Sequence, residues 1–229
     1  MIVSVHQPNF LPWLGFFDKA RQSDVLALLD DAQFAKGSVT NRVKLLISGE
    51  ARWVTCPVLA SNGHFSLISE TQLDLSLTWR EKNLRAIQIS YGRHPYFDEV
   101  MDVMRPLLSS PESSLVDYNV SLIEAISEGL GLDGVTLRLA SDQAVTSKST
   151  QRLVDLVVSC AGDIYLAGGG AAGYQEDALF HERGIYVRYQ SFQARPYPQK
   201  GVTDFVPGLS VLDCLFNVGW EGTIEVLNQ

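Results

Sequence analysis

The sequence lacks several features that would assign it to a membrane or secreted class of protein. No apolar run approaches the roughly 18 residues that a membrane-spanning helix needs. The N-terminus, Met1 to Phe10, has neither the basic start nor the small-residue cleavage site of a signal peptide. The cysteines are few, widely spaced and in apolar surroundings, which favours reduced thiols in a cytoplasmic protein over a disulfide framework. They are Cys56, Cys160 and Cys214.

Positive charge is also scarce. Lys and Arg number 18 against 26 Asp and Glu, which gives a net charge of -8 in 229 residues. This balance excludes an overall basic surface for nucleic acid and disfavours docking on anionic lipid, but it allows a local basic cleft. The four histidines lie far apart and show no metal-binding spacing. We therefore expect a small-molecule partner, and the sequence points to no particular cofactor or oligomeric state.

The residues that are present can build a packed core. Apolar residues make up 46% of the chain and charged residues 19%, as in ordinary globular domains. Met1–Val5 and Val25–Leu29 are short apolar strand candidates, and Trp13–Arg21 between them has apolar residues at helical spacing. A strand, a helix and a strand in such a short stretch predict one βαβ unit with a parallel pair of strands.

The later segments continue this alternation, which predicts an α/β fold with a mostly parallel sheet flanked by helices. We expect a single domain over residues 1–229, with a helical subdomain over residues 79–130 inside it. A hairpin is expected from residues 42–47 and 52–55. Further strands are expected at residues 135–139, 163–166 and 185–189, and further helices at 79–90, 95–108, 114–129, 150–161, 174–183 and 209–216.

The first polar cluster follows the first strand. His6, Gln7 and Asn9 lie in a segment that Pro8 and Pro12 keep irregular. Open α/β sheets bind ligands at the carboxyl ends of their strands, and a following helix offers free N–H groups to an anion. His6 is therefore a candidate acid or base. A rigid proline turn with a hydrogen-bonded histidine accounts for the same residues equally well.

An acidic cluster follows the second strand. Asp30 and Asp31, with Gln33 after them, should lie beside the first cluster if the βαβ unit forms. Two carboxylates and an amide there could bind Mg²⁺, ribose hydroxyls or an amine, and with His6 the two aspartates are the catalytic candidates. The alternative is a solvated turn, in which Asp is common.

A basic cluster lies on the first hairpin strand. Alternation places Arg42 and Lys44 on one face, after Asn41. Two cations on one face could clamp a phosphate or carboxylate, and the alternative is the wet face of an edge strand. We predict that the pocket is electropositive, and that one pocket contains residues from all three clusters. These are His6, Asn9, Asp31, Gln33 and Asn41.

Two further segments are candidate substrate-binding loops. Lys148 and Arg152 open a helix that Ser147 or Ser149 is expected to cap, an arrangement that suits an anion but is more often a simple cap. Gly169 and Gly170 lie in a glycine-rich turn between a strand and a helix, where the backbone can approach a ligand closely. Tyr174 closes this turn. Other polar residues, belonging either to the same cleft or to the fold, are Gln190, Tyr197, Gln199, Asp213 and Asn217.

These motifs resemble those of one known family. The stretch from His6 to Lys19, the run Asp30-Asp31-Ala32-Gln33-Phe34, the pair Asn41-Arg42 and the closing stretch from Leu209 to Gly219 are similar to the WbqC-like family. The family is named from bacterial gene clusters for surface polysaccharide (O-antigen, a part of lipopolysaccharide). The resemblance implies a bacterial cytoplasmic protein that works near nucleotide-sugar or amino-sugar modification, and it supplies no reaction.

A more distant similarity is to the HIGH-type nucleotidylyltransferases, although His6-Gln7-Pro8-Asn9 lacks their second histidine and intervening glycine. We interpret the chain as a transferase that acts on an activated sugar or amino-sugar precursor, with acyl or aminoacyl transfer as the first hypothesis. The alternatives are nucleotidylyl transfer from ATP, and a non-catalytic binding or scaffold protein of a glycan-assembly pathway. Donor, acceptor and metal dependence stay open.

Overall fold

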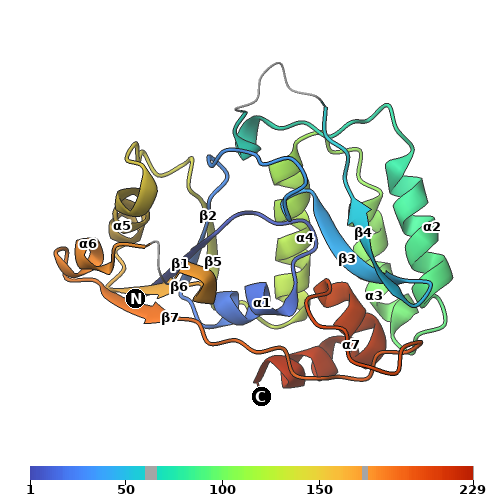
Figure 1. Ribbon diagram of the computed structural model, residues 1–229. Helices are drawn as coiled ribbons and strands as arrows, with labels where there is room; N and C mark the ends of the chain where they lie inside the picture. The colour runs from blue at the N-terminus through green and yellow to red at the C-terminus, as the bar shows by residue number, and fades with distance from the viewer. Residues whose placement is uncertain (60–65, 172–174, 229) are drawn as a thin grey trace. The chain divides into compact units, whose positions relative to one another are not determined.

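The structure is a computed structural model that describes residues 1–59, 66–171 and 175–228 (Figure 1). The chain forms two compact units, each assembled from three stretches of sequence. Unit 1 contains residues 1–7, 15–32 and 132–193, and unit 2 contains residues 8–14, 33–131 and 194–229. Because each unit has its own sheet and its own buried residues, each is described by itself.

Unit 1 is built on a five-stranded parallel sheet. Its strands are β1 (Ile2–His6), β2 (Val25–Leu28), β5 (Thr136–Leu139), β6 (Ile164–Ala167) and β7 (Tyr186–Tyr189). They lie in the order β5-β2-β1-β6-β7, and every neighbouring pair is parallel. The predicted α/β fold with a parallel first pair of strands is confirmed.

Helices cover both faces of this sheet. Helix α1 (Leu14–Arg21) connects β1 to β2, and the residue Ser23 that follows it bonds the Ser4 side chain of β1. Val3 and Val5, which alternate with Ser4, share a core with residues of α5 (Ser149–Ser159) and α6 (Asp177–His181). Figure 1 shows these two helices on the side of the sheet away from α1. Right-handed crossovers that run in opposite directions from β1 require this placement.

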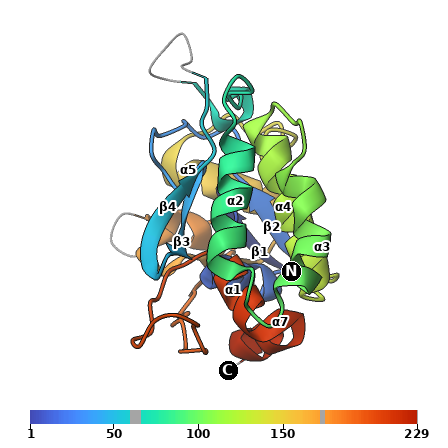
Figure 2. The same ribbon diagram turned by 90° about the vertical axis from the view of Figure 1, so that its right-hand side faces the viewer.

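Unit 2 combines a hairpin with a group of helices. Strands β3 (Arg42–Ile47) and β4 (Glu50–Thr55) pair antiparallel and pack against α2 (Trp79–Tyr91). Helix α2 packs against α3 (Phe97–Leu108), and α3 packs against α4 (Leu115–Gly129), as Figure 2 shows for the group of helices. Helix α7 (Val211–Asn228) packs on α3, and short 3-10 turns lie at Ile68–Glu70 in this unit and Gly169–Ala171 in unit 1.

Three local predictions are wrong. Helix α5 has Lys148 as its N-cap and no side-chain capping bond, because the Ser147 hydroxyl bonds Asp155 instead. Helix α6 begins at Asp177 rather than at residue 174. The last helix extends to Asn228, since the chain kinks at Gly219, with φ of 73°, and then continues as helix.

In the described part of the chain, none of the helices combines the length and apolar character needed to cross a bilayer. Nor do three or more His, Cys, Asp or Glu side chains of those residues gather where they could hold a metal ion.

Candidate functional site

The strongest candidate site in unit 1 is the edge of the sheet where β1 and β6 end. Helix α1 carries the chain from β1 to β2 on one side, while β6 lies on the other side of β1. The direction of winding therefore reverses between β1 and β6, and open α/β sheets bind ligands at such a point, outside the carboxyl ends of the strands. His6 ends β1, and Gly168 follows β6 directly.

Lys19 is the unexpected residue at this edge. Its side chain comes from α1 and is only 4% exposed, and its Nζ donates a hydrogen bond to the Val5 carbonyl at 3.1 Å. A Cβ placed on Gly168 would lie 3.5 Å from Nζ, so the amine lies against the turn that follows β6. Burial lowers the pKa of Lys19 from 10.5 to about 8, because the charged form loses its water.

His6 lies close to this amine. Burial, followed by the charge of Lys19, lowers the pKa of His6 to about 4, so the imidazole is neutral at pH 7. Its Nδ1 lies 3.0 Å from the Gln7 carbonyl, which can only accept, so Nδ1 carries the proton and Nε2 is left as an acceptor. The ring packs edge-on against Phe16 of α1, with centroids 4.9 Å apart.

Partly buried polar contacts hold α1, and with it Lys19, against the end of β7. The Gln190 side chain donates to the Gly15 carbonyl at 2.8 Å and to Asp18 at 2.7 Å. Asp18 also accepts from Arg21 and Gln22. Because these groups are tied together, the amine of Lys19 is held on a rigid element, as a functional site requires. In the sequence, the sign that Lys19 could be buried was its place beside the apolar positions of a short predicted helix.

The acidic residues after β2 have partners within unit 1. Asp30 is 2% exposed and accepts from the backbone N–H and the hydroxyl of Ser141, at 3.0 and 2.6 Å. Asp31 forms an ion pair with Arg152, whose guanidinium also donates to two carbonyls of the loop before α5. The fold thus brings together the predicted residues Asp31 and Arg152, and each compensates the charge of the other. Lys148, which precedes Arg152 by one helical turn in the sequence, is exposed.

The predicted residues of unit 2 fall into two groups. Asn119 donates to the carbonyls of Pro8 and Thr40, at 2.8 and 2.7 Å, and so joins the segments that carry Asn9 and Asn41. Sequence reasoning missed Asn119, because a lone amide within a helix carries no signal. Asn9 and Asn41 are themselves buried.

The basic residues of β3 gather on an aromatic ring of β4. Arg42 and Lys44 lie over Trp53, at 4.2 and 5.2 Å from the ring centroid, on one face of the hairpin. Gln33 pairs with Leu67 through an isolated bridge. The cations of this hairpin therefore have a packing role that needs no ligand.

The single predicted pocket draws on both units. His6 and Asp31 belong to unit 1, at the same edge of the parallel sheet, whereas Asn9, Gln33 and Asn41 belong to unit 2. One pocket for all five remains a prediction. Gly169 and Gly170 are exposed after β6, while Tyr174 lies outside the described residues.

Comparison with known proteins assigns the chain to a family. The model of the WbqC-like protein family matches residues 7–225. The chain belongs to this family. The WbqC-like match extends over residues of both units, including Gln7 and most of α7. Uncharacterized protein Rv1507c of Mycobacterium tuberculosis is 32% identical over 223 residues, which cover 96% of this chain and 94% of that protein. No solved structure matches the chain.

Proposed function

We propose that this WbqC-like protein is a transferase that acts on a nucleotide-sugar or amino-sugar precursor of surface polysaccharide. The observation that carries the proposal is the buried amine of Lys19 beside the neutral imidazole of His6, at the point of the sheet where winding reverses. Titratable groups with displaced pKa values that lie together at such a point are typical of catalytic sites. The precursor and its cellular role follow from the family's link to polysaccharide gene clusters.

Acyl or aminoacyl transfer to a sugar amine suits these two groups. The amine nitrogen attacks the acyl carbon, a C–N bond forms, and the bond to the leaving group breaks with its electron pair. A proton must leave the attacking nitrogen. Lys19, with a pKa of about 8, is uncharged in about a tenth of molecules at pH 7 and takes this proton. His6 Nε2, an acceptor, orients the amine.

Two groups at the same edge of unit 1 can bind the anionic part of the substrate. The exposed Lys148 stands at the start of α5, which follows the carboxyl end of β5. The exposed backbone of Gly169 and Gly170 follows β6, and a side chain at Gly169 would approach the Gln190 carbonyl to 3.1 Å. Backbone N–H groups in a glycine turn can bind phosphate oxygens directly.

The test is a thermal-shift and turnover screen of the full-length protein. The probes are nucleoside diphosphate sugars, amino sugars, acyl-coenzyme A and ATP, and a bound ligand raises the melting temperature. Lys19→Met keeps the length of the buried side chain and removes the amine. We expect Lys19→Met to fold and to lose about two to four orders of magnitude in turnover. The matched control, Lys36→Met, alters an exposed lysine of unit 2 and should match wild type.

Full turnover in Lys19→Met would contradict the assigned base. Release of pyrophosphate from ATP would replace the proposal with nucleotidylyl transfer. If no probe raises the melting temperature of the wild-type protein, a scaffold role is favoured instead.

A further inference from the structure

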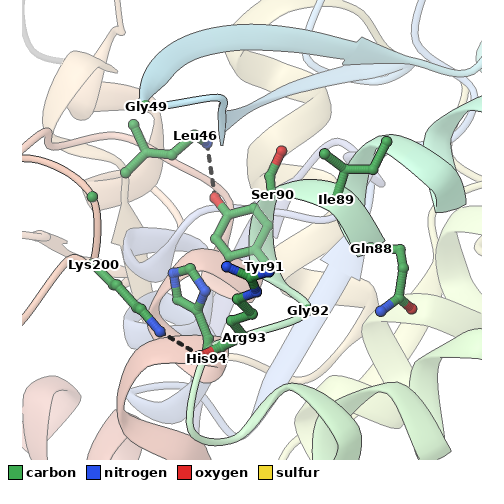
Figure 3. Close-up of a pocket in the computed structure, with 11 residues that line it drawn as sticks. Leu46, Gly49, Gln88, Ile89, Ser90, Tyr91, Gly92, Arg93, His94 and Lys200 are labelled. Atoms are coloured by element: carbon green, nitrogen blue, oxygen red, sulfur yellow. Dashed lines mark hydrogen bonds between the residues drawn. The ribbon is translucent and has the colours of Figure 1, made fainter.

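Unit 2 contains a cavity of about 660 Å³ that no motif in the sequence indicated. It lies between the turn of the β3–β4 hairpin, the end of α2 and the loop at Lys200 and Gly201 (Figure 3). Small-molecule sites in proteins commonly occupy about 300–1,000 Å³, so the cavity has the size of a ligand larger than a bare ion.

The charged residues that line this cavity are both positive. Arg93 and Lys200 line it, and none of its described lining residues is Asp or Glu, although the whole chain has a net charge of -8. Both cationic side chains are exposed to solvent. The Lys200 amine donates to the Arg93 carbonyl, which holds the two residues together and offsets the negative end of α2.

The imidazole of His94 also lines the cavity. The His94 ring packs on Tyr91, with centroids 4.9 Å apart, and Figure 3 shows it on the side of Lys200. Its Nδ1 is buried. Burial, followed by the charge of Lys200, lowers the pKa of His94 against the opposing effects of Asp213 and a hydrogen bond to the Tyr91 backbone, so the ring is neutral at pH 7.

The wall behind the imidazole is rigid. The Tyr91 hydroxyl donates to Asp213 at 2.7 Å and accepts from the Leu46 N–H at 2.8 Å. Asp213 is fully buried and also accepts from Tyr197 and Gln199, both at 2.9 Å. Its charge is therefore compensated by three donors behind the wall. The lysine loop is held as well, since the Lys200 N–H donates to Asn217 at 2.9 Å.

We propose that this cavity binds the phosphate group of a small molecule, which Arg93 and Lys200 contact with charge-assisted hydrogen bonds. Arg93 presents a planar fork of donors that matches phosphate geometry, and Lys200 adds a point charge. The remaining volume holds the organic part of the ligand. This site lies wholly within unit 2 and does not depend on the function proposed for unit 1.

The test is calorimetric titration of the full-length protein with inorganic pyrophosphate. The double variant Arg93→Gln/Lys200→Gln removes both charges, and we expect its affinity to fall at least about tenfold. The control, Lys82→Gln/Arg85→Gln, removes two exposed charges from α2 outside the cavity and should bind as wild type does.

Three results would overturn this proposal, and one would support it. Equal affinity in Arg93→Gln/Lys200→Gln and wild type would overturn the proposal, as would an equal loss in the Lys82→Gln/Arg85→Gln control. Absence of pyrophosphate binding in the wild type would overturn it too. Unchanged pyrophosphate affinity in Lys19→Met would support it, and would show that a failure of the unit 1 proposal leaves this site intact.

Discussion

At the scale of the residue, burial changes the protonation of two basic side chains, Lys19 and His6. Lys19 and His6 are both basic, and loss of water lowers the pKa of each, because the charged form is the one that water stabilises. At pH 7 the amine of Lys19 is therefore partly uncharged, and the imidazole of His6 is neutral. The amine of Lys19 can therefore accept a proton near neutral pH, which an exposed lysine, with its higher pKa, rarely does.

This burial predicts a specific pH dependence of stability. The pKa of His6 is about 4 in the folded protein and 6.5 in the unfolded chain. Between these values the unfolded chain takes up a proton that the folded protein does not, so stability falls as the pH drops from 6.5 to 4. The loss amounts to at most about 3 kcal/mol.

The measurement is the free energy of unfolding of wild type and His6→Gln, by denaturant titration at several pH values. The wild type should lose stability relative to His6→Gln as the pH falls through this window. Parallel curves for the two proteins would show that His6 titrates normally.

At the scale of the element, strand ends in unit 1 are tied to one another by side chains. Asp30 follows β2 and binds both the N–H and the hydroxyl of Ser141, which follows β5. These bonds join the carboxyl ends of two paired strands, the edge at which the candidate site lies. Although the sequence marks Asp30 as a catalytic candidate, its contacts already account for its burial.

We expect Asp30→Ala to lower the free energy of unfolding by about 1–3 kcal/mol, since it leaves the Ser141 N–H without its partner. Asp142→Ala, at an exposed neighbour of Ser141, is the control and should be near neutral. Thermal and denaturant unfolding measure both. If Asp30→Ala keeps wild-type stability but abolishes turnover, the aspartate is catalytic rather than structural.

At the scale of the whole molecule, the chain is interleaved. Each unit takes three separate stretches of sequence, so neither is a continuous fragment. In unit 2, Tyr91 of α2 bonds Asp213 of α7, Phe97 packs on Phe216, and Asn119 bonds the Pro8 carbonyl. The helical region that the sequence marks as a subdomain therefore has essential partners far outside its own boundaries.

It follows that a fragment of residues 33–131 should not fold by itself. It would lack Asp213 beside Tyr91, Phe216 beside Phe97 and the Pro8 carbonyl that Asn119 binds. It would also expose the apolar face of α3 that α7 covers in the full chain. Near-ultraviolet circular dichroism and a thermal scan, with the full-length protein as reference, measure this. A sharp cooperative transition in the fragment would contradict the prediction.

The sequence by itself determined the order and type of nearly all elements. The α/β fold and the parallel pairing of β1 with β2 depend on apolar spacing within about ten residues and on short connections, which a sequence displays directly. His6 and Asp31 at one edge of the sheet follow from the same βαβ unit.

Only the tertiary structure decided which polar side chains meet. Lys19 against Gly168, Arg152 with Asp31, and Asp213 with Tyr91 are contacts between residues more than a hundred positions apart in the chain. The cavity beside Arg93 and Lys200 arises in the same way. No local sequence pattern encodes such pairs. A displaced pKa depends on how much water the folded chain removes from a group, so it cannot be read from the sequence before the fold is known.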